Sequence, residues 1–126
     1  MNLLGIDYGL RRIGLAISSG DLASPLGTAQ DLPNVIRIIE AQGIDKIIIG
    51  LPDPHAEKIK LFGTRLAQVT NLPVEYWDET LSTVTARKLR IASGSSTKEK
   101  KQHIDQNAAA VILQSYLDAQ RPQMPM

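Results

Sequence analysis

The chain has 126 residues, of which 43% are hydrophobic and 21% are charged, and its formal net charge is +1. These values predict one globular domain over residues 1–126 that buries a core of its own, and they argue against a strongly basic coat. The sequence has no cysteine, which excludes disulfides, thiolate zinc sites and a cysteine nucleophile.

Apolar runs in the sequence are short. The segment MNLLGID reaches an aspartate before an apolar run of signal-peptide length can form. No other stretch approaches the length that spans a membrane. We therefore expect a cytoplasmic protein with no membrane partner.

Strand signals dominate the beginning of the chain. LLGIDYG predicts a buried strand, and IGLAISSG predicts a second strand that follows through a turn at residues 9–12, so that the two form a hairpin. A third, short strand is expected over residues 24–30. Pro33 suits the first turn of a helix that continues to Gln42, and Gly43 suits the end of that helix.

Strands and helices alternate in the remainder of the chain. KIIIGLP predicts a strand covered on both faces, as in a parallel sheet. A helix is expected over residues 55–70, and PVEYWDE is the next strand. Ser82 or Thr83 can cap a helix that runs to Ala92, and the polar segment 94–102 is expected to be a mobile loop.

The long helices carry apolar residues at helical spacing. The buried side of the helix at residues 55–70 is predicted to hold Ile59, Phe62, Leu66 and Val69. The last helix is expected over residues 100–120, and its buried side to hold Ile104, Ala108, Val111, Ile112 and Ser115. A hairpin followed by β–α alternation predicts an α/β fold with a mixed sheet flanked by helices.

Asp7 is the first candidate site residue. An aspartate in an otherwise apolar strand must be paired, neutral or bound to a metal, because burial of its isolated charge is costly. The commoner role for a lone aspartate is to accept backbone hydrogen bonds at the end of a strand. Gly9 and Gly14 favour a functional role, since their small size leaves space beside the carboxylate.

Glu79 is the second candidate, and Asp78 competes with it. Alternation along the strand places Glu75, Trp77 and Glu79 on one face and Tyr76 and Asp78 on the other. Glu79 comes at the carboxyl end of its strand, where open α/β sheets collect their ligands. Asp78 could instead brace the following turn, and the residues alone leave the choice open.

Asp105 is the third candidate. It lies in the first turns of the last helix, in line with Ala108, Ala109 and Ile112 on the predicted sheet-facing side. A favourable interaction of an acid with a helix N-terminus is the alternative explanation. His103 is expected to be exposed, where it could reach a substrate phosphate.

Three carboxylates without cysteine suit Mg²⁺ or Mn²⁺ better than zinc. Such an ion can activate water and neutralise charge on a phosphodiester. The sequence has no P-loop, GxSxG or HExxH motif.

Positive charge gathers over residues 84–103, which hold six Lys and Arg residues against one acid. A solvated helix end is the commoner explanation of such a run, but a phosphate backbone would also favour it. The residues that we predict to bind nucleic acid are Arg11, Arg12, Lys98, Lys100, Lys101 and His103.

Four motifs together resemble the YqgF family over nearly the whole chain. They are GIDYGLRRIGLA at 5–16, IIIGLP at 47–52, DETLST at 78–83 and HIDQNAAAVILQSYL at 103–117. Members of that family are described as Holliday junction resolvases or pre-16S rRNA nucleases and are related to RuvC resolvases.

The resemblance implies an RNase H-like fold with a five-stranded mixed sheet, and divalent-metal-dependent hydrolysis of phosphodiester bonds. It also implies a role in maturing the 5′ end of the small-subunit rRNA precursor. The three acids of the family fall on Asp7, Glu79 and Asp105, so that the match prefers Glu79 to Asp78. These acids are therefore predicted both as metal ligands and as catalytic residues.

Two positions depart from related patterns. Thr80 stands where the family motif has an arginine, and Ala108 stands where RuvC resolvases have a further acid. An RNA-binding assembly factor with little or no cleavage activity is therefore an alternative, and a resolvase acting on branched DNA is another. An actin-like nucleotide-binding module is disfavoured, because that fold needs two such lobes. We expect a monomer or a weak homodimer.

Overall fold

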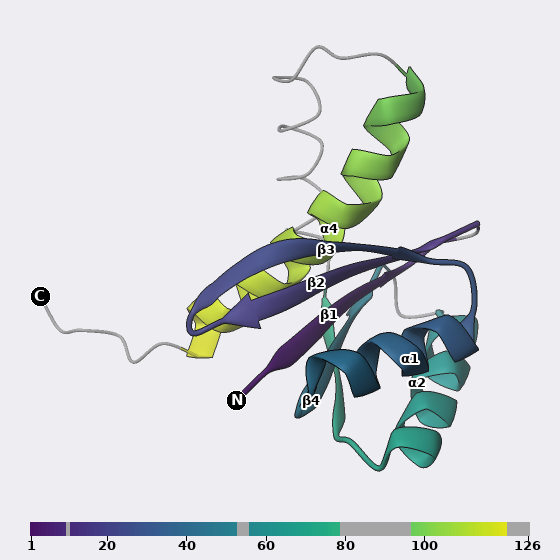
Figure 1. Cartoon of the computed structure of the whole chain (residues 1–126), viewed down its shortest axis with the longest axis vertical. Helices are drawn as coiled ribbons and strands as arrows, with labels where there is room; N and C mark the ends of the chain where they lie inside the picture. The colour runs from purple at the N-terminus through teal and green to yellow at the C-terminus, as the bar shows by residue number, and fades with distance from the viewer. Residues whose placement is uncertain (10, 53–55, 79–96, 121–126) are drawn as a thin grey trace, which may run out of the picture.

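A five-stranded mixed sheet forms the centre of the protein (Figure 1). The computed structural model describes residues 1–9, 11–52, 56–78 and 97–120, with the side chains of 97–107 outside that set. In chain order the elements are β1 (Leu3–Tyr8), β2 (Ile13–Ser19), β3 (Leu22–Ala29), α1 (Leu32–Gln42), β4 (Lys46–Leu51), α2 (Glu57–Thr70), β5 (Val74–Asp78) and α4 (Thr97–Gln120).

The strand order is β3-β2-β1-β4-β5, which confirms the predicted mixed sheet. Strands β1, β2 and β3 are antiparallel neighbours, and β4 and β5 run parallel to β1. Gly9 N–H donates to the Arg12 carbonyl at 3.0 Å and closes the predicted hairpin between β1 and β2. Pro25 sits in β3, an edge strand, where its missing N–H breaks no ladder in the middle of the sheet.

Helices cover both faces of the sheet, and each face has its own core (Figure 1). Helices α1 and α2 lie on one face, where Leu4 and Ile6 of β1 are fully buried. Helix α4 lies on the other face, where it packs on Leu3 and Ile48. Because neighbouring residues of a strand point to opposite faces, Asp7 belongs to the α4 face and Tyr8 to the face of α1 and α2.

Local signals account for α1. Asp31 precedes the helix and accepts a hydrogen bond from Asn34 N–H at 3.1 Å, and Pro33 lies in the first turn. Gly43 ends the helix with φ +61°, a conformation that costs glycine little. The predicted helix, with Pro33 in its first turn and its end at Gln42, is therefore confirmed.

Helix α2 differs from the prediction in two respects. It begins at Glu57, and residue 55, where its start was predicted, lies outside the described set. Val69 is 55% exposed, so its predicted burial is wrong. The buried line ends at Leu66. One turn later, the partly buried Thr70 donates its hydroxyl to the Leu66 carbonyl at 2.6 Å.

Helix α4 is longer than predicted and rotated about its axis. It begins at Thr97, so the part of the predicted loop over residues 97–102 is helical. The buried residues that the structure describes on it are Ala109, Ile112, Leu113, Tyr116 and Leu117. The predicted set of buried residues is therefore wrong: it is shifted by one position, which corresponds to a rotation of the helix by about 100°. Only Ile112 is common to the predicted and the observed sets. The predicted burial of Ile104 and the predicted helix at residues 82–92 lie outside the described set.

Polar contacts explain the rotation of α4. Gln114, at the edge of the contact, accepts from Ala23 N–H at 2.8 Å, and Ser115 accepts from the Trp77 indole N–H at 3.2 Å. These hydrogen bonds hold Gln114 and Ser115 at the edges of the contact between α4 and the sheet. Leu113 therefore faces the sheet. No helix in the described part of the chain is long and apolar enough to cross a membrane.

Candidate functional site

Asp7 lies near the carboxyl end of β1 with glycine on its flanks. Gly14 of β2 is its direct partner across the hairpin. On the other side, Ile6 pairs with Ile49 of β4, so the next pair in the parallel register is Asp7 with Gly50. Asp7 is half-buried, and neither neighbouring strand places a side chain beside it. The sheet positions on both sides of this carboxylate are therefore occupied by glycine.

Helix α4 runs antiparallel to β1 on the same face as Asp7. A Cβ on Gly5 would lie 2.8 Å from Leu113 Cβ and 3.0 Å from the Ala109 carbonyl oxygen. Leu3 packs in the same cluster as Tyr116 and Leu117, nearer the end of α4. Residues later in β1 therefore lie opposite residues earlier in α4. Asp7, at the later end of β1, corresponds to the helical turn that contains Asp105.

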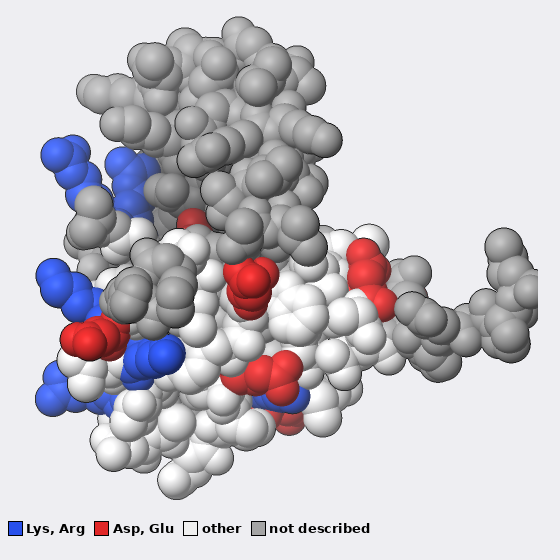
Figure 2. All heavy atoms as spheres, turned by 180° about the vertical axis from the view of Figure 1, so that it is seen from behind, with Lys and Arg blue, Asp and Glu red and all other residues white. Residues whose placement is uncertain are grey.

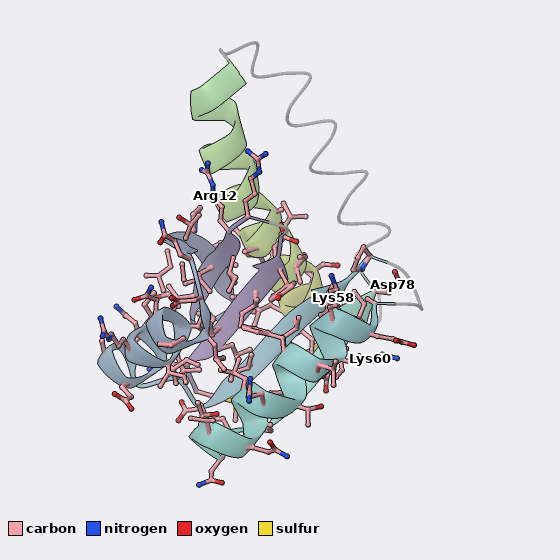
Figure 3. The ribbon with its side chains drawn as sticks, turned by 90° about the vertical axis from the view of Figure 1, so that its right-hand side faces the viewer. Arg12, Lys58, Lys60 and Asp78 are labelled. Carbon is pink, nitrogen blue, oxygen red and sulfur yellow. The ribbon has the colours of Figure 1, made fainter. Side chains whose placement is uncertain are left out.

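Strand β5 alternates as predicted over the residues that the structure describes. Trp77 contacts α4, with its ring centroid 5.5 Å from that of Tyr116 at an interplanar angle of 87°. Tyr76 points to the other face, where its hydroxyl donates to the Lys60 carbonyl of α2 at 3.1 Å. By strand alternation Asp78 follows on the Tyr76 side, away from the face of Asp7. Figure 3 labels Asp78 near Lys58 of α2. Glu79 lies outside the described residues.

A second polar cluster on the α4 face has a structural role. The ammonium group of Lys46 donates to the Tyr116 hydroxyl at 2.8 Å and lies 3.3 Å from a Glu75 oxygen. The hydrogen bond with Tyr116 is the main cause that raises the pKa of Lys46 above 10.5, with Glu75 also raising it and burial opposing it. A raised pKa in the folded state gives a contribution to stability that is complete below pH 10.5 and is lost as pH rises through the folded pKa. Lys46 begins β4, at the end of the sheet opposite to Asp7, so this cluster ties β4, β5 and α4 together away from the candidate site.

The three predicted metal ligands are described to different extents. Asp7 is described in full, Asp105 lies in α4 without a described side chain, and Glu79 is outside the described set. Within the described residues, no three acidic or histidine side chains gather as a metal site. Asp7 by itself is compatible with the predicted ion, because its carboxylate oxygens are hard ligands and it lies near the carboxyl edge of the parallel strands.

The predicted nucleic-acid-binding residues fall into two groups. Arg11 and Arg12 line a pocket at the β1–β2 turn. The others, Lys98, Lys100, Lys101 and His103, are in the first half of α4, and their side chains are outside the described set. Sequence reasoning missed two further cations of the same pocket, Lys58 and Arg65 of α2. They lie two helical turns apart on one face of α2, and this spacing is visible in the sequence.

Comparison with known protein structures supports the fold. The fowlpox virus Holliday junction resolvase superimposes with a TM-score of 0.62 at 15% identity, covering 94% of this chain and 99% of that one. RuvC of T. thermophilus, in complex with a Holliday junction substrate, superimposes with a TM-score of 0.59 at 14% identity and 94% coverage of both chains. The predicted RNase H-like fold is thereby confirmed.

Comparison of sequences identifies the family. A protein of Geobacillus kaustophilus is 38% identical over 96% of this chain and its own full length, and one of Chloroflexus aggregans is 39% identical over 94% of both chains. Both are named "Putative pre-16S rRNA nuclease". Residues 1–119 match the family described as "RuvX: Holliday junction resolvase". The chain therefore belongs to the RuvX family, as its resemblance to YqgF proteins implied.

Proposed function

We propose that this protein is a divalent-metal-dependent nuclease that hydrolyses phosphodiester bonds in the precursor of 16S rRNA. The observation that carries the proposal is the placement of Asp7, a half-buried carboxylate between glycine positions, on the sheet face that α4 crosses. The names of the similar proteins point to the rRNA precursor as the substrate. A cytoplasmic location belongs to the same proposal.

The register of α4 supports a role for Asp105. Two residues of strand, from Gly5 to Asp7, span about 6.6 Å. Four residues of helix, from Ala109 back to Asp105, span about 6 Å. Gly5 lies against Ala109. Asp7 and Asp105 therefore lie at similar distances from this contact, and in the same direction, along the two antiparallel elements. Helical periodicity also continues the buried line of Ile112 and Ala109 to Asp105.

The register of β5 supports Glu79 over Asp78. Trp77 pairs with Gly50, and Gly50 is the next neighbour of Asp7 in the sheet. Glu79 comes two residues after Trp77, so continued strand alternation would place it on the same face. Asp78 belongs to the α2 face, so the sheet separates it from Asp7.

Asp7, Glu79 and Asp105 would hold Mg²⁺ or Mn²⁺ in this arrangement, because carboxylate oxygens are the ligands these ions prefer. When bound, such an ion lowers the pKa of a water and stabilises charge that develops on the phosphodiester. The chain itself would contribute the three carboxylates, and Gly14 and Gly50 would let a bulky phosphate backbone come close to Asp7.

The proposal is tested by a cleavage assay on two substrates, an rRNA precursor that spans the 5′ end of 16S rRNA and a four-way DNA junction. We expect cleavage of the precursor with Mg²⁺ or Mn²⁺, and loss of cleavage when EDTA removes the metal. Cleavage that survives EDTA would contradict the metal dependence. Cleavage of the junction alone would establish the resolvase alternative, and tight RNA binding without cleavage would establish the assembly-factor alternative.

The adjacent acids of β5 provide a sharper test. We expect Glu79→Gln to lower the cleavage rate by at least about 100-fold, because about 3 kcal/mol of transition-state stabilisation is lost with a metal ligand. Asp78→Asn makes the same chemical change one residue away on the opposite face, and we expect less than about a threefold effect, under 1 kcal/mol. Equal losses in both variants would remove the argument from strand alternation.

A further inference from the structure

A pocket of 690 Å³ opens at the β1–β2 turn, on the sheet face that α1 and α2 cover. Residues of the turn, of the start of α1 and of α2 line it. Its charged lining residues are Arg11, Arg12, Lys58 and Arg65 against Asp31. Figure 2 shows the Lys and Arg side chains of the face it presents gathered mostly toward its left edge, with the acids spread more widely. Four cations against one carboxylate make this pocket a site for an anion.

The side chain of Arg12 has a buried donor atom for which the described residues offer no acceptor. Its Nη1 atom is buried, and none of the described residues accepts a hydrogen bond from it. Leaving a buried, charged donor unpaired costs free energy, and native proteins seldom do so without a functional reason. Figure 3 labels Arg12 on the β1–β2 turn and Lys58 on the first turn of α2. Arg12 lines the pocket, so an anionic oxygen bound there would lie beside its guanidinium.

The size and apolar lining of the pocket point to more than a single phosphate ion. Its volume lies in the range of pockets that take small organic ligands, about 300–1,000 Å³. Phe62 packs on Tyr8 with ring centroids 4.8 Å apart, and both line the pocket. Leu61, also in the lining, is 71% exposed and adds apolar surface to the pocket. Cations beside apolar and aromatic groups match a nucleotide, whose phosphate is charged and whose base is flat.

We propose that this pocket binds one nucleotide unit of the substrate strand, with its phosphate at Arg12 and the α2 cations. The inference rests on the proposed nuclease function and adds a second contact with the substrate, on the sheet face opposite to Asp7. The nucleic-acid strand would then run from one face of the sheet to the other past the β1–β2 turn. Gly9 keeps this turn tight, since a Cβ there would lie 2.6 Å from the Arg12 carbonyl oxygen. Contacts to a phosphate position the strand and carry no sequence information.

Two double variants with equal loss of charge test the proposal. Lys58→Gln with Arg65→Gln removes two cations of the pocket, and Lys60→Gln with Arg37→Gln removes two exposed cations outside it. Binding of labelled single-stranded RNA and DNA oligonucleotides is measured by fluorescence anisotropy in EDTA, so that no cleavage occurs. We expect the pocket variant to bind the oligonucleotides about tenfold more weakly, and the salt dependence of its affinity to correspond to about two fewer phosphate contacts. In the control we expect the affinity to change by less than about twofold. Equal effects in both variants, or no effect in either, would overturn the proposal.

Competition distinguishes a strand from a free small anion. We expect inorganic phosphate and a mononucleotide to displace the oligonucleotide only weakly, because the strand makes further contacts outside the pocket. A mononucleotide that binds the wild type but not the pocket variant, while oligonucleotide binding is equal in both, would assign the pocket to a free nucleotide and overturn the proposal. Because these measurements need no cleavage, they separate failure of the pocket from failure of the nuclease function.

Arg12→Met separates a binding role from a structural one. The substitution keeps the apolar stem and removes the buried Nη1 donor, for which the described residues offer no acceptor. We therefore expect the midpoint of thermal unfolding to rise by about 3 °C, while oligonucleotide binding weakens as in the pocket variant. A lower midpoint would show that Arg12 stabilises the fold, and together with unchanged binding it would overturn the proposal.

Discussion

Asp7→Asn is expected to lower the rate of metal-dependent cleavage by at least about 100-fold, with little change in the stability of the fold. The substitution keeps the size of the side chain and removes the charge that a divalent cation needs, and a loss of about 3 kcal/mol in transition-state stabilisation is about a hundredfold in rate. Gly14 is the direct partner of Asp7 in the sheet, and it offers no side chain that could replace the lost charge. The measurement is cleavage of the rRNA precursor under single-turnover conditions.

Asp21→Asn is the matched control for Asp7→Asn. Asp21 is an exposed aspartate in the turn between β2 and β3, outside the candidate site. We expect wild-type cleavage in this variant, and wild-type binding of Mn²⁺ measured by calorimetry. In Asp7→Asn we expect Mn²⁺ binding to weaken together with cleavage. Cleavage at the wild-type rate in the Asp7 variant would remove this acid from the mechanism.

Gly5→Ala is expected to destabilise the fold by about 2 to 3 kcal/mol, the cost of overpacking a core that cannot relax. A Cβ at this position would lie 2.8 Å from Leu113 Cβ and 3.0 Å from the Ala109 carbonyl oxygen. Neither atom is the end of a flexible side chain, so α4 as a whole must move away from the sheet. Because α4 also carries Asp105, we expect cleavage to fall in the fraction of protein that remains folded.

Urea-induced unfolding, followed by the fluorescence of the single tryptophan, measures the effect of Gly5→Ala. Trp77 packs on Tyr116 and donates to Ser115, so its emission reports directly on the contact between α4 and the sheet. Gly20→Ala is the control: Gly20 has φ +63°, and a Cβ there would meet no atom within 4 Å. We expect it to cost about 1 kcal/mol through backbone strain and to leave cleavage unchanged. A loss in Gly5→Ala no larger than in the control would show that α4 adapts to the extra methyl group.

Elements with strong local signals were predictable from the sequence. Helix α1 is framed by Asp31, Pro33 and Gly43, and these residues act through hydrogen bonds and backbone preferences within a few positions of each other. The strands were equally readable, because apolar runs between turn residues encode them locally. Asp7 could be singled out for the same reason, since a charge within an apolar strand is visible without knowledge of its neighbours.

The orientation of α4 was not predictable in this way. Most of its second half is apolar, so several faces could serve as the buried one, and the choice depends on Gly5 and on polar partners such as Ala23 and Trp77. These residues lie far from α4 in the sequence. The predicted line was therefore one position away from the buried one, and the helical part of the predicted loop was missed.

The sequence by itself determined the order of the strands and helices, the hairpin at residues 9–12 and the choice of Asp7 as a candidate, because periodicity, capping and the cost of a buried charge act over short stretches of chain. Only the tertiary structure decided which face α4 presents to the sheet and on which side of it Asp78 lies. It alone brought Arg12 into one pocket with Lys58 and Arg65. Contacts of this kind depend on the order of strands in the sheet and on how closely α2 approaches the hairpin, which no local pattern encodes.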